Sequence, residues 1–326
     1  MTNILVVGGA GYIGSHTCLD LSTKGFTPVV YDNLSNGHAE FCRWGPLEQG
    51  DLKDRERLVA IMKQHRPAAI VHFAALIEVG ESMKDPLAFY ENNVAGTLTL
   101  LSAAAEAGVD KIVFSSTCAT YGEPVEVPMP ETHRQAPLNP YGRSKRMVEE
   151  VLADLDAIKG VRSVVLRYFN AAGADPEGRI GEWHEPETHA IPLAIEAALG
   201  RRAGFKMFGT DYDTRDGTCV RDYIHVMDLA DAHSRAVQYL IDGGASTAIN
   251  LGTGTGTTVK ELLDAIVALT GRAFPVEVTE RRPGDAPALV AVNDKARDVL
   301  GWQPRHDLAS IVQTAWNWHS RSNLGG

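Results

Sequence analysis

The sequence has few cysteines and no sign of a cross-linked framework. Its 326 residues include four cysteines, Cys18, Cys42, Cys118 and Cys219, which lie far apart and form no C-x-x-C pair. Disulfide-rich domains and structural zinc sites need cysteines at close, repeated spacings. The sequence therefore argues against both, and we expect a reducing compartment, the cytoplasm.

Positive charge and long apolar runs are also scarce. Lys and Arg total 31 against 41 Asp and Glu, which gives a formal net charge of -10 at pH 7. A nucleic-acid-binding protein needs a basic face, so we expect no nucleic-acid partner. No apolar run approaches the roughly 20 residues that span a bilayer, and the N-terminus has no basic segment with a cleavage site. We therefore expect neither a membrane partner nor a secretion signal.

What the sequence does contain is an alternation of short apolar strands and amphipathic helices. We predict strands at Asn3–Gly8, Pro28–Tyr31, Ala69–Phe73, Lys111–Ser115 and Arg162–Tyr168, and helices near 12–24, 54–64, 86–107 and 140–158. Such alternation with Val/Ile-rich strands is typical of a parallel sheet covered on both faces. We predict an α/β fold with a doubly wound, Rossmann-like parallel sheet over residues 1–170.

From about residue 171 the pattern is less regular. Residues 171–189 are rich in Gly, Pro and charge, which indicates a long and therefore functional loop. A helix near 190–200, a strand at Ala248–Leu251 and a helix at 258–270 follow. We predict a smaller α/β substrate domain at residues 171–326, with segments near 221–252 packing back on the first domain.

The first predicted strand ends in a glycine-rich turn that opens a helix. Residues Gly8–Gly14 read G-x-x-G-x-x-G, a spacing variant of the dinucleotide fingerprint. The glycines let a pyrophosphate approach the backbone, and the helix N-terminus supplies N–H donors. Asp32 ends the second strand, where a carboxylate binds ribose hydroxyls and repels the extra phosphate of NADP. We therefore predict NAD as the cofactor, with contacts from Gly8, Gly11, Tyr12, Ile13, Gly14, Asp32, Asn33, Asp51 and Leu52.

A second glycine-rich run, Gly252–Gly256, also follows a predicted strand. It lacks the strand–helix–strand context of a nucleotide site, so we interpret it as a structural turn.

Tyr141 and Lys145 are four residues apart and lie on the same face of a predicted helix. An ammonium beside a phenol favours the phenolate, so we expect Lys145 to lower the pKa of Tyr141 towards neutrality. Such a tyrosine takes a proton from a sugar or alcohol hydroxyl. Thr117 follows the strand at Lys111–Ser115, so its hydroxyl is expected in the same ligand crevice.

The sequence contains, in order, the segments GGAGYIGSH, HFAALIEVGES, FSSTCATYG, NPYGRSK, RYFNAAGA and VRDYIHVMDLAD. In this order and spacing they resemble the extended short-chain dehydrogenase/reductase superfamily, and more closely its UDP-glucose 4-epimerase family, over essentially the whole chain. The resemblance implies reversible epimerisation of a UDP-hexose at C4 through transient hydride transfer to NAD. It also implies a UDP-sugar substrate and a homodimer joined by a four-helix interface, here the helices near 86–107 and 140–158 with Leu98, Leu101, Val148 and Leu152.

The resemblance also implies roles for individual residues. Tyr141 would be the acid/base, Lys145 would hold the nicotinamide ribose, and Thr117 would be the third catalytic residue. The NAD pocket would add Phe73, Ala74, Asn92, Ser115 and Tyr168 to the residues above, besides Tyr141 and Lys145. The substrate would contact Thr117, Tyr141, Asn170, His189, Phe208, Arg221, Arg282 and Asp285.

Three positions depart from the family pattern. Ile77 stands where many relatives have a lysine that grips NAD, so tight retention of the cofactor is an open question. His189 stands where relatives often have an asparagine on the nucleotide. Leu289 is intermediate between the large and small residues that gate N-acetylated sugars, so acceptance of N-acetylated or pentose substrates stays open.

Two other functions compete with C4 epimerisation. A 4,6-dehydratase of the same superfamily carries an Asp-Glu pair after the threonine, whereas this chain has Cys118-Ala119. A non-catalytic NAD-binding regulator typically loses the tyrosine or the lysine, and both are present here. His184 and His189 do not form H-E-x-x-H and Pro186 argues against a helix between them, so we predict a loop that covers the substrate and no metal.

Overall fold

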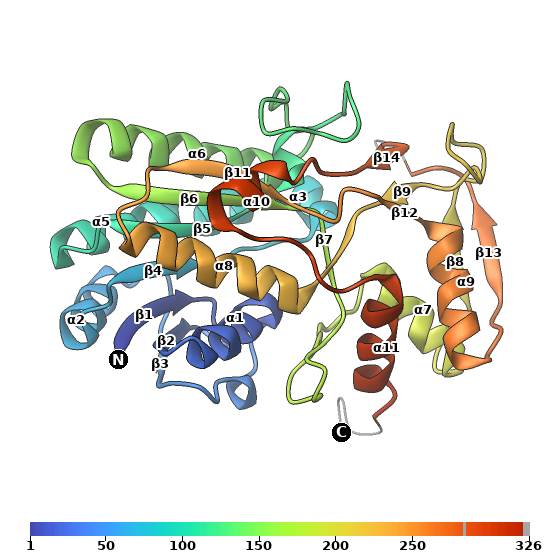
Figure 1. Cartoon of the computed structure of the whole chain (residues 1–326), viewed down its shortest axis with the longest axis horizontal. Helices are drawn as coiled ribbons and strands as arrows, with labels where there is room; N and C mark the ends of the chain where they lie inside the picture. The colour runs from blue at the N-terminus through green and yellow to red at the C-terminus, as the bar shows by residue number, and fades with distance from the viewer. Residues whose placement is uncertain (283–284, 322–326) are drawn as a thin grey trace.

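The centre of the molecule is a seven-stranded parallel sheet with strand order β11-β6-β5-β4-β1-β2-β3 (Figure 1). The computed structural model describes residues 1–282 and 285–321. The sheet strands are β1 Thr2–Val7, β2 Phe26–Asp32, β3 Leu47–Gln49, β4 Ala69–His72, β5 Lys111–Thr117, β6 Arg162–Tyr168 and β11 Thr247–Leu251. The strand order reverses between β1 and β4, which is the switch point of a doubly wound sheet. The predicted fold class is confirmed.

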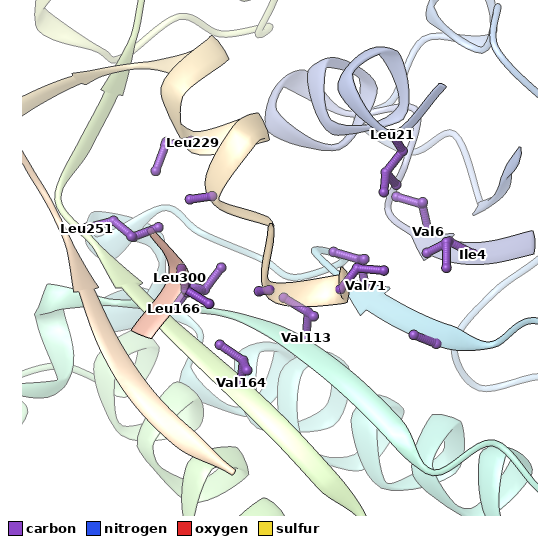
Figure 2. Packing of buried hydrophobic residues seen from close by; sticks show 14 of the residues in the cluster. Ile4, Val6, Leu21, Val71, Val113, Val164, Leu166, Leu229, Leu251 and Leu300 are labelled. Carbon is purple, nitrogen blue, oxygen red and sulfur yellow. The ribbon is translucent and has the colours of Figure 1, made fainter. Parts of the chain in front are cut away.

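Helices cover both faces because successive side chains of a strand point to opposite sides. Ile4 and Val6 of β1 pack in one core with Leu21 and Leu229, whereas Leu5 packs in the other. The first core lies under α1 Tyr12–Thr23, α8 Val226–Ile241 and α10 Asp294–Leu300, and Figure 2 shows its side chains. The second lies under α2 Arg55–His65, α5 Gly96–Ala107 and α6 Pro140–Lys159.

A helix runs over 86–107 as predicted, but it contains a π-helical turn that the sequence did not predict. The chain forms α3 Val79–Lys84, α4 Pro86–Phe89, a π-helical turn at Tyr90–Ala95 and then α5. Short 3₁₀ turns lie at Ala39–Phe41 and Cys118–Thr120. The π turn shifts the helix register, a feature that is frequent at functional sites.

The remaining elements form a smaller region beside the carboxyl ends of the sheet strands (Figure 1). Its strands are β7 Asn170–Ala172, β8 Phe205–Phe208, β9 Val220–Arg221, β10 Tyr223–His225, β12 Thr257–Thr258, β13 Val276–Thr279 and β14 Ala288–Leu289. They pair as β10-β7, β12-β9-β14 and β13-β8. The helices α7 Ala190–Ala198, α9 Val259–Thr270 and α11 Leu308–His319 pack in a core of their own. The domain boundary at residue 170 stays a prediction.

Three of the four apolar residues predicted at a dimer interface are core residues. Leu101, Val148 and Leu152 are buried within the subunit, and Leu98 is 44% exposed. Among the residues that the structure describes, no helix combines the length and apolar character that crossing a bilayer requires.

Candidate active site

A cavity of about 740 Å³ lies where the sheet strands end and the smaller region begins. It brings together most of the predicted site residues, which come from both halves of the chain. They are Gly8, Gly11, Tyr12, Ile13, Gly14, Asp32, Asn33, Leu52, Phe73, Ala74, Asn92, Ser115, Thr117, Tyr141, Lys145, Tyr168, Asn170, His189, Arg221 and Asp285. The carboxyl ends of parallel strands are where ligands bind in open α/β sheets.

Three predicted contacts are absent from the wall of this cavity. Asp51 accepts a hydrogen bond from Nδ2 of Asn33 at 2.9 Å, and this bond orients a residue that does line the wall. The guanidinium of Arg282 lies 3.7 Å from the ring centroid of Phe208, so these two side chains stack on each other. Direct ligand contacts from Asp51, Phe208 and Arg282 stay predictions.

The glycine turn is shaped for close approach of a ligand. Gly8 has φ +82°, and a Cβ there would meet the backbone nitrogen of Ala74 at 2.5 Å. A Cβ on Gly14 would lie 2.2 Å from the Gly8 carbonyl oxygen, whereas one on Gly11 would meet nothing closer than 3.5 Å. The first N–H groups of α1 have no partner within the helix. The turn therefore offers N–H donors at a cavity wall without side chains, which fits a pyrophosphate.

Asp32 lies at the end of β2 with 9% of its surface exposed. Its carboxylate accepts hydrogen bonds from the backbone N–H of Ala10, at 3.0 Å, and of Leu34, at 2.9 Å. Burial raises the pKa of this carboxyl, and the two N–H donors oppose the rise. A fixed carboxylate at the edge of the cavity fits the hydroxyls of an adenosine ribose.

The catalytic candidates come from α6 and β5. Asn139 caps α6 by accepting from the N–H of Gly142 at 2.8 Å, and a Cβ on Gly142 would lie 2.5 Å from the Ala119 carbonyl oxygen. This close approach sets Tyr141 beside the end of β5, where Thr117 lies. The ammonium of Lys145 donates to the Ser115 carbonyl oxygen at 2.8 Å. Burial lowers the pKa of Lys145 to about 7.

The expectation that Lys145 lowers the pKa of Tyr141 is wrong for this structure. Burial raises the pKa of the Tyr141 phenol above its usual range, and a hydrogen bond with Thr117 opposes the rise. The Lys145 ammonium donates to the Ser115 carbonyl, and Lys145 is not among the groups that shift the pKa of Tyr141. Helical spacing located the pair correctly but contained no information about desolvation.

The sequence did not single out every residue of the cavity wall. Glu182 and His184 line it together with His189, because the segment after β7 folds back over the cavity. The sequence feature that could have identified them is the predicted loop at residues 171–189, which is rich in charge and proline. Burial lowers the pKa of His189, but Glu182 and Glu187 outweigh it and raise that pKa to about 10. Ile77 and Leu289, the two other departures from the family pattern, also line the wall.

The second glycine-rich run is a turn held by the protein itself. The carboxylate of Asp222 accepts from the backbone N–H of Thr253 at 2.7 Å and of Gly254 at 3.2 Å. These donors are therefore engaged with a side chain of the chain, in agreement with a structural turn.

Comparison with known proteins gives consistent matches. The model of the NAD dependent epimerase/dehydratase family matches residues 4–252. A UDP-glucose 4-epimerase of Rhizobium meliloti (strain 1021) is 72% identical over 324 residues, covering 99% of both chains. The UDP-glucose 4-epimerase from Brucella ovis, solved in complex with NAD, is 50% identical, with a TM-score of 0.96, covering 98% of this chain and 99% of that one. The Bifidobacterium longum enzyme, solved with NAD+ and UDP, is 35% identical with a TM-score of 0.94 and full coverage of both chains. This chain therefore belongs to the NAD dependent epimerase/dehydratase family.

Proposed function

We propose that this chain interconverts UDP-glucose and UDP-galactose by reversible epimerisation at C4, with NAD as its cofactor. The observation that carries the proposal is a shared cavity: the glycine turn at Gly8–Gly14, the Tyr141 phenol and the Arg221 guanidinium all line it. The full-length similarity to UDP-glucose 4-epimerases supports the same reaction.

The residues that line the cavity divide into one set for each of the two ligands. NAD would be held by the glycine turn and Asp32, with Phe73, Asn92 and Tyr168 along its length. The UDP moiety would be held by Asn170, His189, Arg221 and Asp285. Arg221 Nη2 lies 3.6 Å from Asp285, and its planar guanidinium suits a diphosphate. When bound, NAD supplies the hydride acceptor and donor for C4 of the sugar.

The proton transfer belongs to Tyr141. As the phenolate, Tyr141 would take the proton of the 4-hydroxyl as the C4–H bond breaks and return it when that bond re-forms on the opposite face. The positive charge of bound NAD and of Lys145 would have to favour the phenolate against the effect of burial. Thr117 hydrogen-bonds the same substrate oxygen, and Lys145 contributes positive charge to the buried cavity. Sugar and cofactor therefore end the cycle in their original oxidation states.

Neither residue that follows Thr117 can act as the acid of a dehydratase. Cys118 lines the cavity, and burial raises the pKa of its thiol to about 12. Ala119 has no ionisable group. Elimination of water across C5 and C6 would lack its carboxylic acid, which favours epimerisation over the 4,6-dehydratase.

The test is incubation of the purified protein with a panel of UDP-sugars, with the 4-epimers resolved chromatographically. We expect UDP-glucose and UDP-galactose to interconvert. The N-acetylated and pentose UDP-sugars in the panel test which substrates fit into the cavity beside Leu289. Tyr141→Phe is expected to slow the reaction by about 10²–10⁴-fold, the usual contribution of a general acid–base group, while NAD binding is kept.

The matched control is Tyr223→Phe, because Tyr223 is a buried tyrosine of β10 outside the wall of this cavity. It is expected to keep the wild-type rate. A 4-keto-6-deoxy product, or full activity of Tyr141→Phe, would overturn the proposal.

We also propose a cytoplasmic homodimer. The thiols of Cys18, Cys42, Cys118 and Cys219 are all free, which suits a reducing compartment. Apolar side chains exposed on α3 to α6 support the second subunit.

A further inference from the structure

Four potential metal ligands converge in the segment between β7 and α7. Glu182, His184, Glu187 and His189 each offer one donor atom, and these atoms all lie within 4.8 Å of one another. Two imidazole nitrogens and two carboxylate oxygens form the set. The segment is a loop, so its spacing differs from the helical H-E-x-x-H pattern by which such sites are usually found in a sequence.

The imidazole nitrogens and carboxylate oxygens lie 3.0–3.9 Å apart, around the spacing of a four-coordinate site. Nδ1 of His189 lies 3.0 Å from Oε1 of Glu182 and 3.0 Å from Oε1 of Glu187. Nδ1 of His184 lies 3.4 Å from the Glu182 oxygen and 3.9 Å from Oε2 of Glu187. Zinc bonds of about 2.0–2.2 Å in tetrahedral geometry place neighbouring donor atoms about 3.3 Å apart.

Two of the donor residues are held by further hydrogen bonds, and Glu182 is the buried member of the set. The backbone N–H groups of Thr188 and His189 donate to Oε1 of Glu187 at 2.7 and 2.8 Å. The side chain of Glu182 is 4% exposed, and its backbone carbonyl accepts from the indole of Trp318 at 2.8 Å. Such outer contacts orient ligands before an ion binds.

One of the nitrogens has no partner of its own. Nδ1 of His184 is inaccessible to water and makes no hydrogen bond within the described part of the chain. A buried polar atom without a partner carries a free-energy cost. Glu182 and Glu187 also bring two carboxylates together, and either a proton on His189 or a metal ion can balance their charge.

We propose that Glu182, His184, Glu187 and His189 bind a divalent transition-metal ion of the zinc class. The mixed imidazole and carboxylate set suits Zn²⁺ or Co²⁺ better than Mg²⁺ or Ca²⁺, which prefer oxygen ligands alone. The role of the ion is structural: it ties the segment 182–189 into a closed loop at the cavity wall. The site contains none of Tyr141, Thr117 and Lys145, but it lies on the same cavity wall and shares His189 with the proposed UDP contacts.

The experiment measures metal binding by the NAD-loaded full-length protein. After equilibration with Zn²⁺ and removal of free ion, elemental analysis is expected to find about one equivalent per chain. With Co²⁺ as the probe, the visible absorption is expected to have the intensity and position of a four-coordinate ion. The double variant His184→Ala/Glu187→Gln is expected to bind at least about 100-fold more weakly, since it lacks two ligands.

The control is Glu185→Gln, an exposed glutamate of the same loop whose carboxylate accepts from the indole N–H of Trp183. It is expected to bind both ions as the wild type does. Circular dichroism of the double variant checks that it is folded, and the single variant Glu187→Gln replaces it if it is not. Equal uptake by wild type and variant, or no uptake by the wild type, would show that a proton on His189 is the only cation of the cluster and would overturn the proposal.

Discussion

Lys145 is a buried amine whose protonation is linked to stability. Its side chain is 3% exposed, and burial lowers its pKa to about 7 whereas an unfolded chain has a lysine pKa near 10.4. Between these values the unfolded chain binds a proton that the folded chain does not, so the folded state gains stability as pH rises through this window. Below pH 7 the full cost of burying the charge is present.

Lys145→Met is therefore expected to become more stable relative to wild type as pH falls. The difference in free energy of unfolding should favour the variant by about 4 kcal/mol more at pH 6 than at pH 10. Denaturant unfolding of nucleotide-free protein at both pH values measures it. Lys159→Met, at an exposed position at the end of the same helix, is expected to show no such change. If Lys145→Met and wild type differed by the same free energy of unfolding at both pH values, the lowered pKa of Lys145 would be contradicted.

At the scale of residues, the sequence predicted most of the residues that line the cavity, but it did not predict how their pKa values shift. Tyr141, Lys145 and Thr117 were placed correctly because helical spacing and strand ends are local properties. The raised pKa of Tyr141 comes first from burial, and charge interactions with Tyr168 and Glu78, which are distant in the sequence, add to it. Glu182 and His184 were missed for the same reason, since their loop reaches the wall only in the folded chain.

At the scale of elements, the turn from β1 into α1 leaves no room for a side chain at Gly14. The Cβ of an alanine there would lie 2.2 Å from the Gly8 carbonyl oxygen, so either the turn or the helix must move. Gly14→Ala is expected to weaken NAD binding at least about 10-fold, since a 1 Å displacement of a site is costly. Isothermal titration calorimetry with NAD measures the affinity.

Gly80→Ala is the control for this substitution. Gly80 lies in α3, and a Cβ there would meet no atom within 4 Å. Its NAD affinity should equal that of the wild type. If Gly14→Ala bound NAD equally well, the turn would not be the pyrophosphate site.

A buried ion pair joins α6 to β6 directly behind the catalytic residues. Arg167 Nη2 lies 2.5 Å from Oε2 of Glu149, both side chains are 7% exposed, and Ser116 of β5 donates to the same carboxylate. Glu149→Gln is expected to cost about 3–5 kcal/mol of unfolding free energy, because it leaves a buried guanidinium without its counter-charge. Glu149→Gln/Arg167→Met should recover part of that loss.

The comparison pair lies on the same helix. Arg146 and Glu150 are 3.0 Å apart but 39% and 61% exposed. Glu150→Gln is therefore expected to cost less than about 1 kcal/mol. Chemical denaturation of all four proteins measures these values, and similar losses for Glu149→Gln and Glu150→Gln would refute the role of burial.

At the scale of elements, the strands of the sheet other than β3 agreed with the predicted ones because Val/Ile runs depend on local sequence. The π turn at Tyr90–Ala95 did not follow from periodicity, since one shifted residue leaves an apolar pattern almost unchanged. Asn93 shows why it forms: its side-chain amide donates to the Leu76 carbonyl at 2.9 Å and to Ser144 at 3.1 Å. These hydrogen bonds to residues distant in the sequence stabilise the π-helical register.

For the whole molecule, exposed apolar side chains mark the surface where we propose the second subunit. Met83, Leu87, Leu98 and Met147 of α3 to α6 are 64%, 70%, 44% and 45% exposed. Light scattering is expected to give the mass of two subunits, and Leu98→Glu/Met147→Glu the mass of one. Val278→Glu, on β13 at the far end of the molecule in Figure 1, should stay dimeric. A wild-type mass of one subunit would exclude the dimer.

The sequence predicted the layered architecture of the whole molecule. It did not distinguish the apolar residues of a subunit interface from those of the subunit core. Leu101, Val148 and Leu152 have the same helical spacing as an interface, yet they fill the subunit core. Periodicity identifies an apolar face without stating whether the sheet or another subunit covers it.

The position of β11 has a consequence for biosynthesis. This strand, residues 247–251, completes the sheet by pairing with β6, and α8 packs on α1 from the same late part of the chain. When the ribosome has released only residues 1–170, the outer edge of β6 is unpaired and one face of the sheet is covered by α1 alone, without α8 and α10. Such an edge pairs readily with other strands. This edge is therefore open to mispairing in the nascent chain until about 80 further residues have emerged.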